Sequence, residues 1–293
     1  MKRTDFLRHI AWTGTGLAYT IGATGLVAQA ALAQGSSDFN FVQISDSHIG
    51  FNKPANEDTD ATLKKAVDAI NAMPSQPAFV IHTGDITHLS KPAEFDTAKH
   101  ILGALKAPLI TIPGEHDVIG DGFKTYSSMF NHKESKDGWY SWDQKGAHFV
   151  ALVNVFNFEK MGQLGIAQID WLGKDLASVK NDTPVIVFGH VPLYALYPPW
   201  GWTTEDGGKV LSMLKRFSAV TVLNGHIHQI ITHSEGNIRF YTAAATAYPQ
   251  PAPGKAAAPG PLKVRASELL TLLGYRTVEV GPVPAKVVDH PLG

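Results

Sequence analysis

Short apolar segments alternate with stretches of helical periodicity along most of this chain, and this alternation limits the possible folds more than any other feature. The predicted strands cover 39–45, 78–82, 109–112, 185–188 and 220–223. Amphipathic stretches predict helices at about 57–72, 92–105, 165–179 and 204–216. Strands that are joined by helical crossovers form mainly parallel sheets buried on both faces. The sequence therefore predicts an α/β protein.

Other segments predict hairpins and loops. Residues 139–155 alternate around a turn, and the chain alternates again through 229–232 and 238–242. A Pro/Ala/Gly-rich stretch at 249–262 predicts a loop. We therefore expect a catalytic domain at 34–248, this loop, and a C-terminal segment, 263–293, that returns one strand to the domain. The alternative for the last segment is a disordered tail.

The first 33 residues predict an export signal rather than part of the fold. The first eight residues carry three basic side chains, and no charged side chain occurs between Ile10 and Ser37. Ala31-Leu32-Ala33 is typical of a signal-peptide cleavage site. The start resembles a twin-arginine signal but lacks its second arginine, so the export route stays open. We expect a periplasmic or secreted protein that contacts the membrane only through this segment; the alternative is an uncleaved tether.

Charge and cysteine content exclude several classes of site. The 25 Lys and Arg residues nearly balance the 26 Asp and Glu residues, whereas nucleic-acid binders usually carry a basic face. The chain has no cysteine, which excludes disulfides, thiolate zinc sites and cysteine nucleophiles. Any bound metal must therefore use carboxylate oxygens and the nitrogens of the 13 histidines.

Five predicted strands end in residues that can bind a metal ion. These residues stand in the blocks Asp46-Ser47-His48, Gly84-Asp85, Gly114-Glu115-His116-Asp117, Gly189-His190 and Gly225-His226-Ile227-His228. Because ligands bind at the carboxyl ends of strands in such sheets, we expect all five blocks to surround one crevice. Glycine at these turns lets the backbone leave the strand sharply.

This mixture of ligands suits a pair of metal ions. Imidazole and carboxylate ligands without thiolate favour Mn, Fe or Zn. Two such cations, held about 3.5–4 Å apart, need a bridging anion and convert a water between them into a nucleophile. They also neutralise phosphate oxygens as charge builds on the phosphorus. The pattern therefore favours hydrolysis of a phosphate ester.

Together, the five blocks resemble the calcineurin-like metallophosphoesterase superfamily and occur in its order over residues 46–228. The resemblance implies two mixed β-sheets packed as a sandwich flanked by helices, and a bridging hydroxide as nucleophile between two metal ions. It assigns Asp46, His48 and His228 to the first metal, Asp85 to both, and His190, His226 and Glu115 to the second. His116 would stand beside the leaving-group oxygen as proton donor or oxyanion stabiliser, and Asp117 would orient it.

Glu115 departs from the family pattern, which usually has Asn at this position. Its carboxylate can still supply a ligand oxygen, but it adds a negative charge and one methylene of reach. We expect metal binding to persist, because anionic oxygen favours hard cations, and phosphate binding to be opposed slightly. The alternative is that Glu115 turns away and leaves the second metal site weak.

The substrate is less well defined than the metal ligands. An aromatic loop follows His190 and could form a wall for a flat group; its candidate contacts are Tyr194, Tyr197, Trp200 and Trp202. The alternative is that this loop packs over the sheet. His88 could reach the rim of the site. Three functions remain open: hydrolysis of small phosphate mono- or diesters, binding of metal or phosphate with little turnover, and hydrolysis of a non-phosphate bond.

Overall fold

The computed structural model describes residues 18–22, 25–29, 39–120, 122–130, 137–155, 162–281 and 284–293. It divides into two compact units, one up to Asp38 and one from Phe39 to Gly293. In the first unit, β1 (Ala18–Gly22) pairs antiparallel with β2 (Gly25–Gln29). The basic start and the cleavage motif at 31–33 lie outside the described residues. Within the described part of the chain, no helix combines the length and apolar character needed to cross a bilayer.

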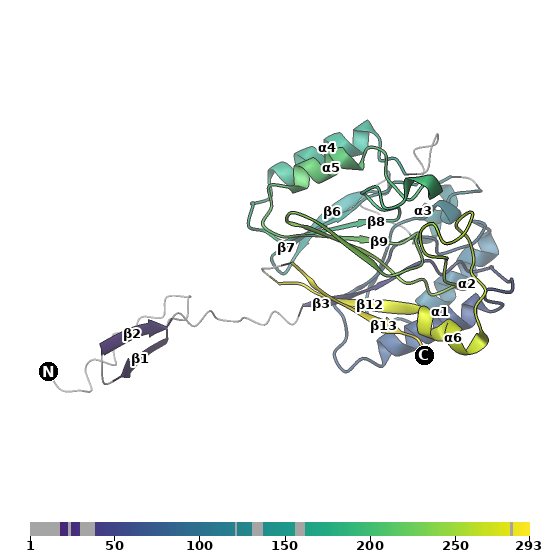
Figure 1. Cartoon of the computed structure of the whole chain (residues 1–293), viewed down its shortest axis with the longest axis horizontal. Helices are drawn as coiled ribbons and strands as arrows, with labels where there is room; N and C mark the ends of the chain where they lie inside the picture. Colours follow the sequence, from purple (N-terminus) through teal and green to yellow (C-terminus); the bar gives the residue numbers. More distant parts are fainter. Residues whose placement is uncertain are drawn as a thin grey trace. The chain divides into compact units, whose positions relative to one another are not determined.

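The second unit contains two mixed β-sheets (Figure 1). One has the order β13-β12-β3-β4-β5 and the other the order β10-β11-β9-β8-β7-β6. The five-stranded sheet consists of β3 (Asn40–Ile44), β4 (Val80–His82), β5 (Leu109–Thr111), β12 (Gly274–Glu279) and β13 (Lys286–Pro291). The six-stranded sheet consists of β6 (Tyr140–Gln144), β7 (Ala147–Ala151), β8 (Val185–Gly189), β9 (Val220–Asn224), β10 (Ile231–Glu235) and β11 (Ile238–Thr242).

Parallel pairing occupies the middle of the six-stranded sheet, whereas in the five-stranded sheet it extends from β3 to the edge strand β5, and the other side of that sheet is antiparallel. The strands β3, β4 and β5 run parallel, as do β7, β8, β9 and β11. Crossover helices join most of these parallel strands, and the two predicted hairpins are β6–β7 and β10–β11. The α/β sandwich of two mixed sheets is thus confirmed, and the carboxyl ends of the parallel strands present the predicted blocks.

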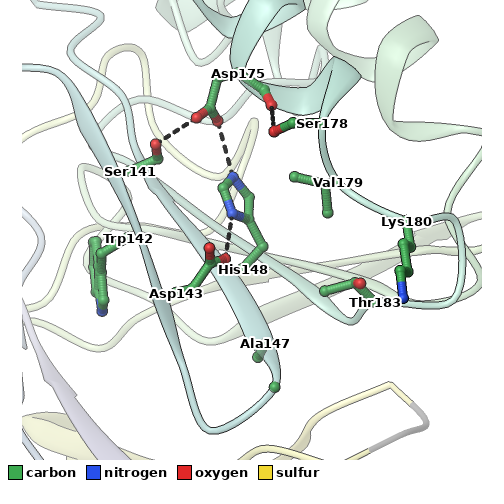
Figure 2. Close-up of a pocket in the computed structure, with 11 residues that line it drawn as sticks. Ser141, Trp142, Asp143, Ala147, His148, Asp175, Ser178, Val179, Lys180 and Thr183 are labelled. Carbon is green, nitrogen blue, oxygen red and sulfur yellow. Dashed lines mark hydrogen bonds and ion pairs between the residues drawn. The ribbon is translucent and has the colours of Figure 1, made fainter.

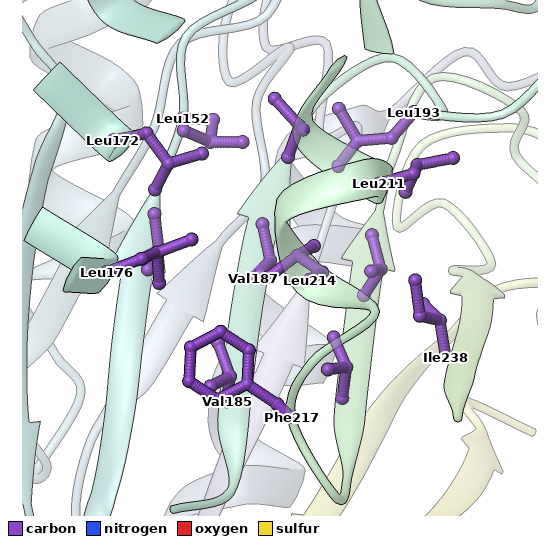
Figure 3. Packing of buried hydrophobic residues seen from close by; sticks show 14 of the residues in the cluster. Leu152, Leu172, Leu176, Val185, Val187, Leu193, Leu211, Leu214, Phe217 and Ile238 are labelled. Atoms are coloured by element: carbon purple, nitrogen blue, oxygen red, sulfur yellow. The ribbon is translucent and has the colours of Figure 1, made fainter. Parts of the chain in front are cut away.

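The helices cover the outer faces of the sandwich. The helices α1 (Thr59–Asn71), α2 (Pro92–Leu102) and α3 (Lys124–Phe130) pack on the five-stranded sheet. The helices α4 (Ile166–Ala177) and α5 (Gly207–Leu214) pack on the six-stranded sheet. Figure 3 shows Leu176 and Leu214 from these two helices packing beside Val187 of β8. Apolar side chains repeat on the buried side of each helix. This repeat predicted four of these five helices, and α3 was not predicted.

An aromatic core joins the two sheets to each other. Phe41 of β3 stacks on Phe79 with ring centroids 4.7 Å apart and meets Phe188 of β8 edge-on at 5.7 Å. Phe149 of β7 contacts the same group from the six-stranded sheet. Fully burying such side chains contributes roughly 1.5–3 kcal/mol each, before entropic costs. This core fixes the distance between the two sets of strand ends.

The C-terminal segment contributes more structure than the sequence predicts. The sequence predicts one strand in 263–293, whereas the structure has α6 (Ala266–Leu272) followed by β12 and β13. The strand β12 pairs antiparallel with β3, and β13 forms the edge of the sheet. The second strand escapes prediction because only the two valines of Lys286–Pro291 favour a strand, and its charged residues and proline are typical of an edge. The loop at 249–262 contains no helix or strand.

His148 fastens the β6–β7 hairpin to α4 (Figure 2). Its Nδ1 lies 2.8 Å from Asp143 Oδ1, and its Nε2 lies 2.9 Å from Asp175 Oδ2. Ser141 donates a hydrogen bond of 2.6 Å to the other oxygen of Asp175. Because both ring nitrogens face carboxylates, the ring binds best as imidazolium. Although burial opposes this, hydrogen bonds to Asp175 and Asp143 raise the pKa of His148.

The raised pKa of His148 predicts a pH-dependent contribution to stability. The contribution is fully present below the unfolded-state pKa of about 6.5 and is lost as pH rises through the higher folded-state pKa. We expect His148→Gln to lower the free energy of unfolding most near pH 5.5–6 and progressively less toward pH 9, as measured by urea denaturation. The same substitution at exposed His100 in α2 is the control. A loss in free energy of unfolding that does not change with pH would contradict the proposed pairing of a His148 imidazolium with the two carboxylates.

Candidate metal centre

Every residue predicted to bind a metal lies at one end of the sandwich, just after a strand. The five-stranded sheet supplies Asp46 and His48 after β3, Asp85 after β4 and Glu115 after β5. The six-stranded sheet supplies His190 after β8, and His226 and His228 after β9. One sheet thus provides all the carboxylates of the centre, and the other provides only imidazoles.

Among the described residues, three groups of side chains could each hold a metal ion, and two of them consist only of predicted ligands; the third joins His48 to His88 and His116. In the first group, His48 Nε2 lies 3.1 Å from His228 Nε2, which lies 3.5 Å from Asp46 Oδ1. The second group consists of Asp85, Glu115, His190 and His226. In each group the ligand atoms lie within 4.8 Å of one another. The two groups match the two sets that the resemblance assigns.

Glu115 points into the second group. Its Oε2 lies 2.8 Å from His190 Nε2, and its Oε1 lies 2.7 Å from His226 Nδ1. Although burial acts to raise it, the pKa of the Glu115 carboxyl is held well below its usual range by His226 and His190. The alternative in which Glu115 turns away is therefore wrong, and the longer side chain reaches the position of a ligand.

Asp85 lies between the two groups. Its Oδ2 is 3.5 Å from His48 Nε2 of the first group and 3.4 Å from His190 Nε2 of the second. Its other oxygen accepts a 2.9 Å hydrogen bond from the backbone N–H of His116. A single carboxylate oxygen therefore faces both groups, which is the arrangement of a bridging ligand.

The donor atoms at this centre fit metal ions. Within the described residues, two buried polar atoms of the centre, Asp46 Oδ2 and His226 Nε2, have neither a hydrogen-bond partner nor an ion-pair partner. Leaving buried polar groups without partners costs about 1–3 kcal/mol each. Cations would satisfy these atoms and neutralise the carboxylates, and the oxygen and imidazole donors suit Mn, Fe or Zn.

Backbone carbonyls orient two of the imidazoles. His190 donates from Nδ1 to the carbonyl of Thr83 at 2.6 Å, and His228 donates from Nδ1 to the carbonyl of Tyr248 at 2.6 Å. These bonds fix the tautomer, so each Nε2 is free to bind a metal. The His48 ring differs, because its Nδ1 lies 3.4 Å from Nδ1 of His88.

A comparison with protein families identifies the domain. The family model described as calcineurin-like phosphoesterase matches residues 39–230. The chain belongs to the calcineurin-like phosphoesterase family. This phosphoesterase is therefore a metal-dependent hydrolase of the class that the five blocks indicate. The groups of His, Asp and Glu that could hold metal ions lie within the matched residues.

Relatives of this phosphoesterase carry names of both diesterases and phosphatases. A glycerophosphodiester phosphodiesterase, GpdQ, of Enterobacter lignolyticus is 26% identical, with 66% of this chain and 71% of the relative covered. A probable cyclic nucleotide phosphodiesterase of Rhodococcus erythropolis is 23% identical, with 71% of each chain covered. A dimetal phosphatase from Danio rerio has the same fold, with a TM-score of 0.63 at 14% identity over 86% of this chain and 98% of that chain.

Strained backbone surrounds the metal centre of the phosphoesterase. Positive φ angles occur at five of the predicted ligands: Asp46 (54°), His48 (42°), Asp85 (54°), His226 (68°) and His228 (55°). For residues other than glycine, this left-handed conformation costs roughly 1–2 kcal/mol each. Such strain persists only where the surrounding structure enforces it, and it concentrates at functional sites. The turns direct successive side chains of one strand end into the clusters of possible ligands.

His116 and Asp117 have different surroundings from those the resemblance implies. His116 donates from Nδ1 to the carbonyl of His88 at 2.7 Å, and its ring stacks on the His88 ring at 5.1 Å. The carboxylate of Asp117 accepts instead from the backbone N–H groups of Ile86, Thr87 and Gly114, at 3.1, 2.8 and 2.9 Å. Asp117 therefore braces the loops around Asp85, and the orientation of the His116 ring comes from His88.

The aromatic loop after β8 divides between the core and the surface. Trp202 is 1% exposed, so its predicted contact with substrate is wrong. Tyr194 packs on His233 and Phe240, in agreement with the alternative of a loop packed over the sheet. Tyr197 and Trp200 are partly exposed and meet edge-on at 5.1 Å. Their contact with substrate stays a prediction, whereas His88 lies directly against His48 and His116.

The sequence did not indicate that one aromatic residue, Tyr248, packs against predicted ligands and that another, Phe51, packs on Tyr248. Tyr248 stacks on His48 at 4.9 Å and contacts His228 at 4.7 Å, and Phe51 packs on Tyr248 at 4.3 Å. Burial, together with nearby carboxylates, raises the pKa of the Tyr248 phenol, so it remains protonated. Tyr248 lies directly before the proline-rich loop, where no local pattern indicates a role.

A Cβ atom at Gly114 would meet the carboxylate of Asp85. It would lie 2.1 Å from Asp85 Oδ1 and 2.2 Å from the Asp85 backbone nitrogen. We expect Gly114→Ala to displace Asp85, to destabilise the protein by about 1–3 kcal/mol and to lower its metal content. Urea denaturation and metal analysis of the purified protein measure both effects. The control is Gly208→Ala in α5, where no atom lies within 4 Å of the new methyl group. Metal content equal to wild type would refute the proposed role of this close approach.

Proposed function

We propose that this phosphoesterase is an exported hydrolase of small phosphate esters that acts through a centre of two metal ions, drawn from Mn, Fe and Zn. The observation that carries the proposal is the position of Asp85, whose single oxygen lies 3.5 Å from His48 Nε2 and 3.4 Å from His190 Nε2. In the proposal, Asp46, His48 and His228 hold one ion, and Glu115, His190 and His226 hold the other. Asp85 belongs to both.

The chemistry of the reaction divides between the ions and the chain. A bound pair of cations supplies Lewis-acid chemistry, which lowers the pKa of a water and neutralises phosphate oxygens. The chain holds the ligands rigidly, because five of them stand on enforced turns. Glu115 adds a negative charge close to the phosphate site, so it favours highly charged ions and opposes binding of an anionic substrate slightly.

His116 is the proposed proton donor to the leaving group. Its Nδ1 proton is engaged by the carbonyl of His88 at 2.7 Å, so Nε2 is the nitrogen that remains to exchange a proton. The ring is half-buried and contacts His48 edge-on at 4.7 Å, which places it beside the first group of ligands. A positioned acid of this kind typically accelerates a reaction by about 10²–10⁴-fold.

An ester panel tests the proposed function. The mature protein is loaded with Mn, Fe or Zn and assayed with bis(para-nitrophenyl) phosphate, para-nitrophenyl phosphate, phenyl phosphate as the poorer leaving group and, as the non-phosphate control, para-nitrophenyl acetate. We expect metal-dependent hydrolysis of at least one phosphate ester and two ions per chain. His116→Ala should retain both ions and lose about 10²–10⁴-fold in kcat, with a larger loss for phenyl than for para-nitrophenyl esters.

Two outcomes of the panel contradict the proposal at different points. A protein that holds two ions yet hydrolyses no phosphate ester is a binding module or acts on another bond. An equal loss for good and poor leaving groups in His116→Ala excludes proton donation and leaves only oxyanion stabilisation for that residue.

Export is proposed from the sequence alone. Three basic residues precede an uncharged run from Ile10 to Ser37, which contains a small-residue cleavage motif at 31–33. We expect the mature chain to begin at Gln34 and to be recovered outside the cytoplasm. N-terminal sequencing of the protein from fractionated cells measures this. Recovery of the full-length chain in the cytoplasmic fraction would contradict it.

A further inference from the structure

A single Lys or Arg side chain is buried in the described part of the chain. Arg276 in β12 is 1% exposed, whereas every other described Lys or Arg is partly or fully exposed. Burying a charge costs several kcal/mol unless it is paired and hydrogen-bonded. Arg276 lies outside the residues that the family model matches, so the motifs give no account of it.

Strand register places Arg276 between two polar partners. It stands opposite Asp289 of β13 on one side and opposite Gln43 of β3 on the other. Its Nε donates to Asp289 Oδ1 at 2.7 Å, and its Nη1 donates to Gln43 Oε1 at 3.4 Å. Its Nη2 donates to the carbonyl of Thr242 in the six-stranded sheet at 2.9 Å. The guanidinium thus binds both sheets of the sandwich.

The contact with Arg276 determines which way the Gln43 amide faces. Because a guanidinium can only donate hydrogen bonds, it binds the oxygen end of the amide. The nitrogen end then faces the metal centre, where it donates to Thr83 Oγ1 at 2.9 Å and to the carbonyl of Asn224 at 3.2 Å. Thr83 Oγ1 donates in turn to Ser45 Oγ at 2.7 Å.

Each group that this network reaches lies next to a predicted metal ligand. Ser45 precedes Asp46, and Asn224 stands two residues before His226. Thr83 stands two residues before Asp85, and its carbonyl accepts the Nδ1 hydrogen bond of His190 at 2.6 Å. Gln43, Ser45, Thr83 and Asn224 are fully buried. The network therefore joins the ends of β3, β4 and β9 immediately before their ligands.

We infer that Arg276 is a positioning residue of the metal centre, which acts through Gln43 to fix the strand ends that carry the ligands. The inference rests on the proposed metal centre. It makes the C-terminal strand β12 a part of the catalytic unit. Removing the support of a ligand typically weakens metal binding by about 10–100-fold.

Chelator competition tests this inference on the metal-loaded full-length mature protein. We expect Arg276→Met and Gln43→Leu each to weaken metal binding by at least about tenfold. The metal affinity of the double variant should equal that of the single variant with the lower affinity, because both substitutions break the same network. Arg276→Lys should fall between wild type and Arg276→Met. At saturating metal, kcat should recover, because every ligand is still present.

Lys286→Met in β13 is the matched control, since Lys286 is an exposed cation of the same sheet that pairs only with Glu279 at 3.2 Å among the described residues. Its metal affinity should equal that of wild type. If Arg276→Met does not fold, Gln43→Leu carries the test, because it leaves Arg276 bound to Asp289 and Thr242. Reduced thermal stability of the metal-free variants with unchanged metal affinity overturns the inference. Wild-type protein that binds no metal overturns the proposed function instead.

Discussion

Three carboxylates lie in one largely buried cluster, and the rest of the site follows from the need to neutralise them. Asp46 and Asp85 are almost completely buried, and Glu115 completes the set. Isolated charges of this kind are too costly to bury, so they must be paired or bound to cations. Four imidazoles surround them, yet within the described residues two donor atoms still have neither a hydrogen-bond partner nor an ion-pair partner. The cluster thus fits the binding of metal ions.

Holding the ligands in this arrangement costs free energy, and contacts elsewhere in the fold offset that cost. Five ligands occupy left-handed backbone, which costs free energy at every turn. The surrounding contacts hold these turns in place: Asp117 binds three backbone N–H groups, Gly114 lets two loops meet, and Gln43 joins three strand ends. Rigidity at the centre therefore derives from residues that themselves contact neither metal nor substrate.

Local sequence patterns predicted what depends on local structure. The pattern of apolar residues predicts the strands, and the order of the five blocks places Asp and His at their ends. The structure brings these residues together. The resemblance implies that Asp117 orients His116, whereas the partners of Asp117 lie on another loop, which no local pattern indicates. Arg276 and Tyr248 left no signal, because their roles depend on strand register and on long-range packing. Trp202 shows that an aromatic loop does not reveal which of its rings faces inward.

The division of ligands between the sheets ties metal capture to folding. Each group takes residues from both sheets: His228 completes the group of Asp46 and His48, and His190 and His226 complete that of Asp85 and Glu115. Neither half of the sandwich can assemble a full coordination shell by itself. Ions bound by both sheets would therefore link them, and the binding energy would add to the stability of the folded domain. A chain that has not yet closed its halves has no high-affinity place to take up an ion.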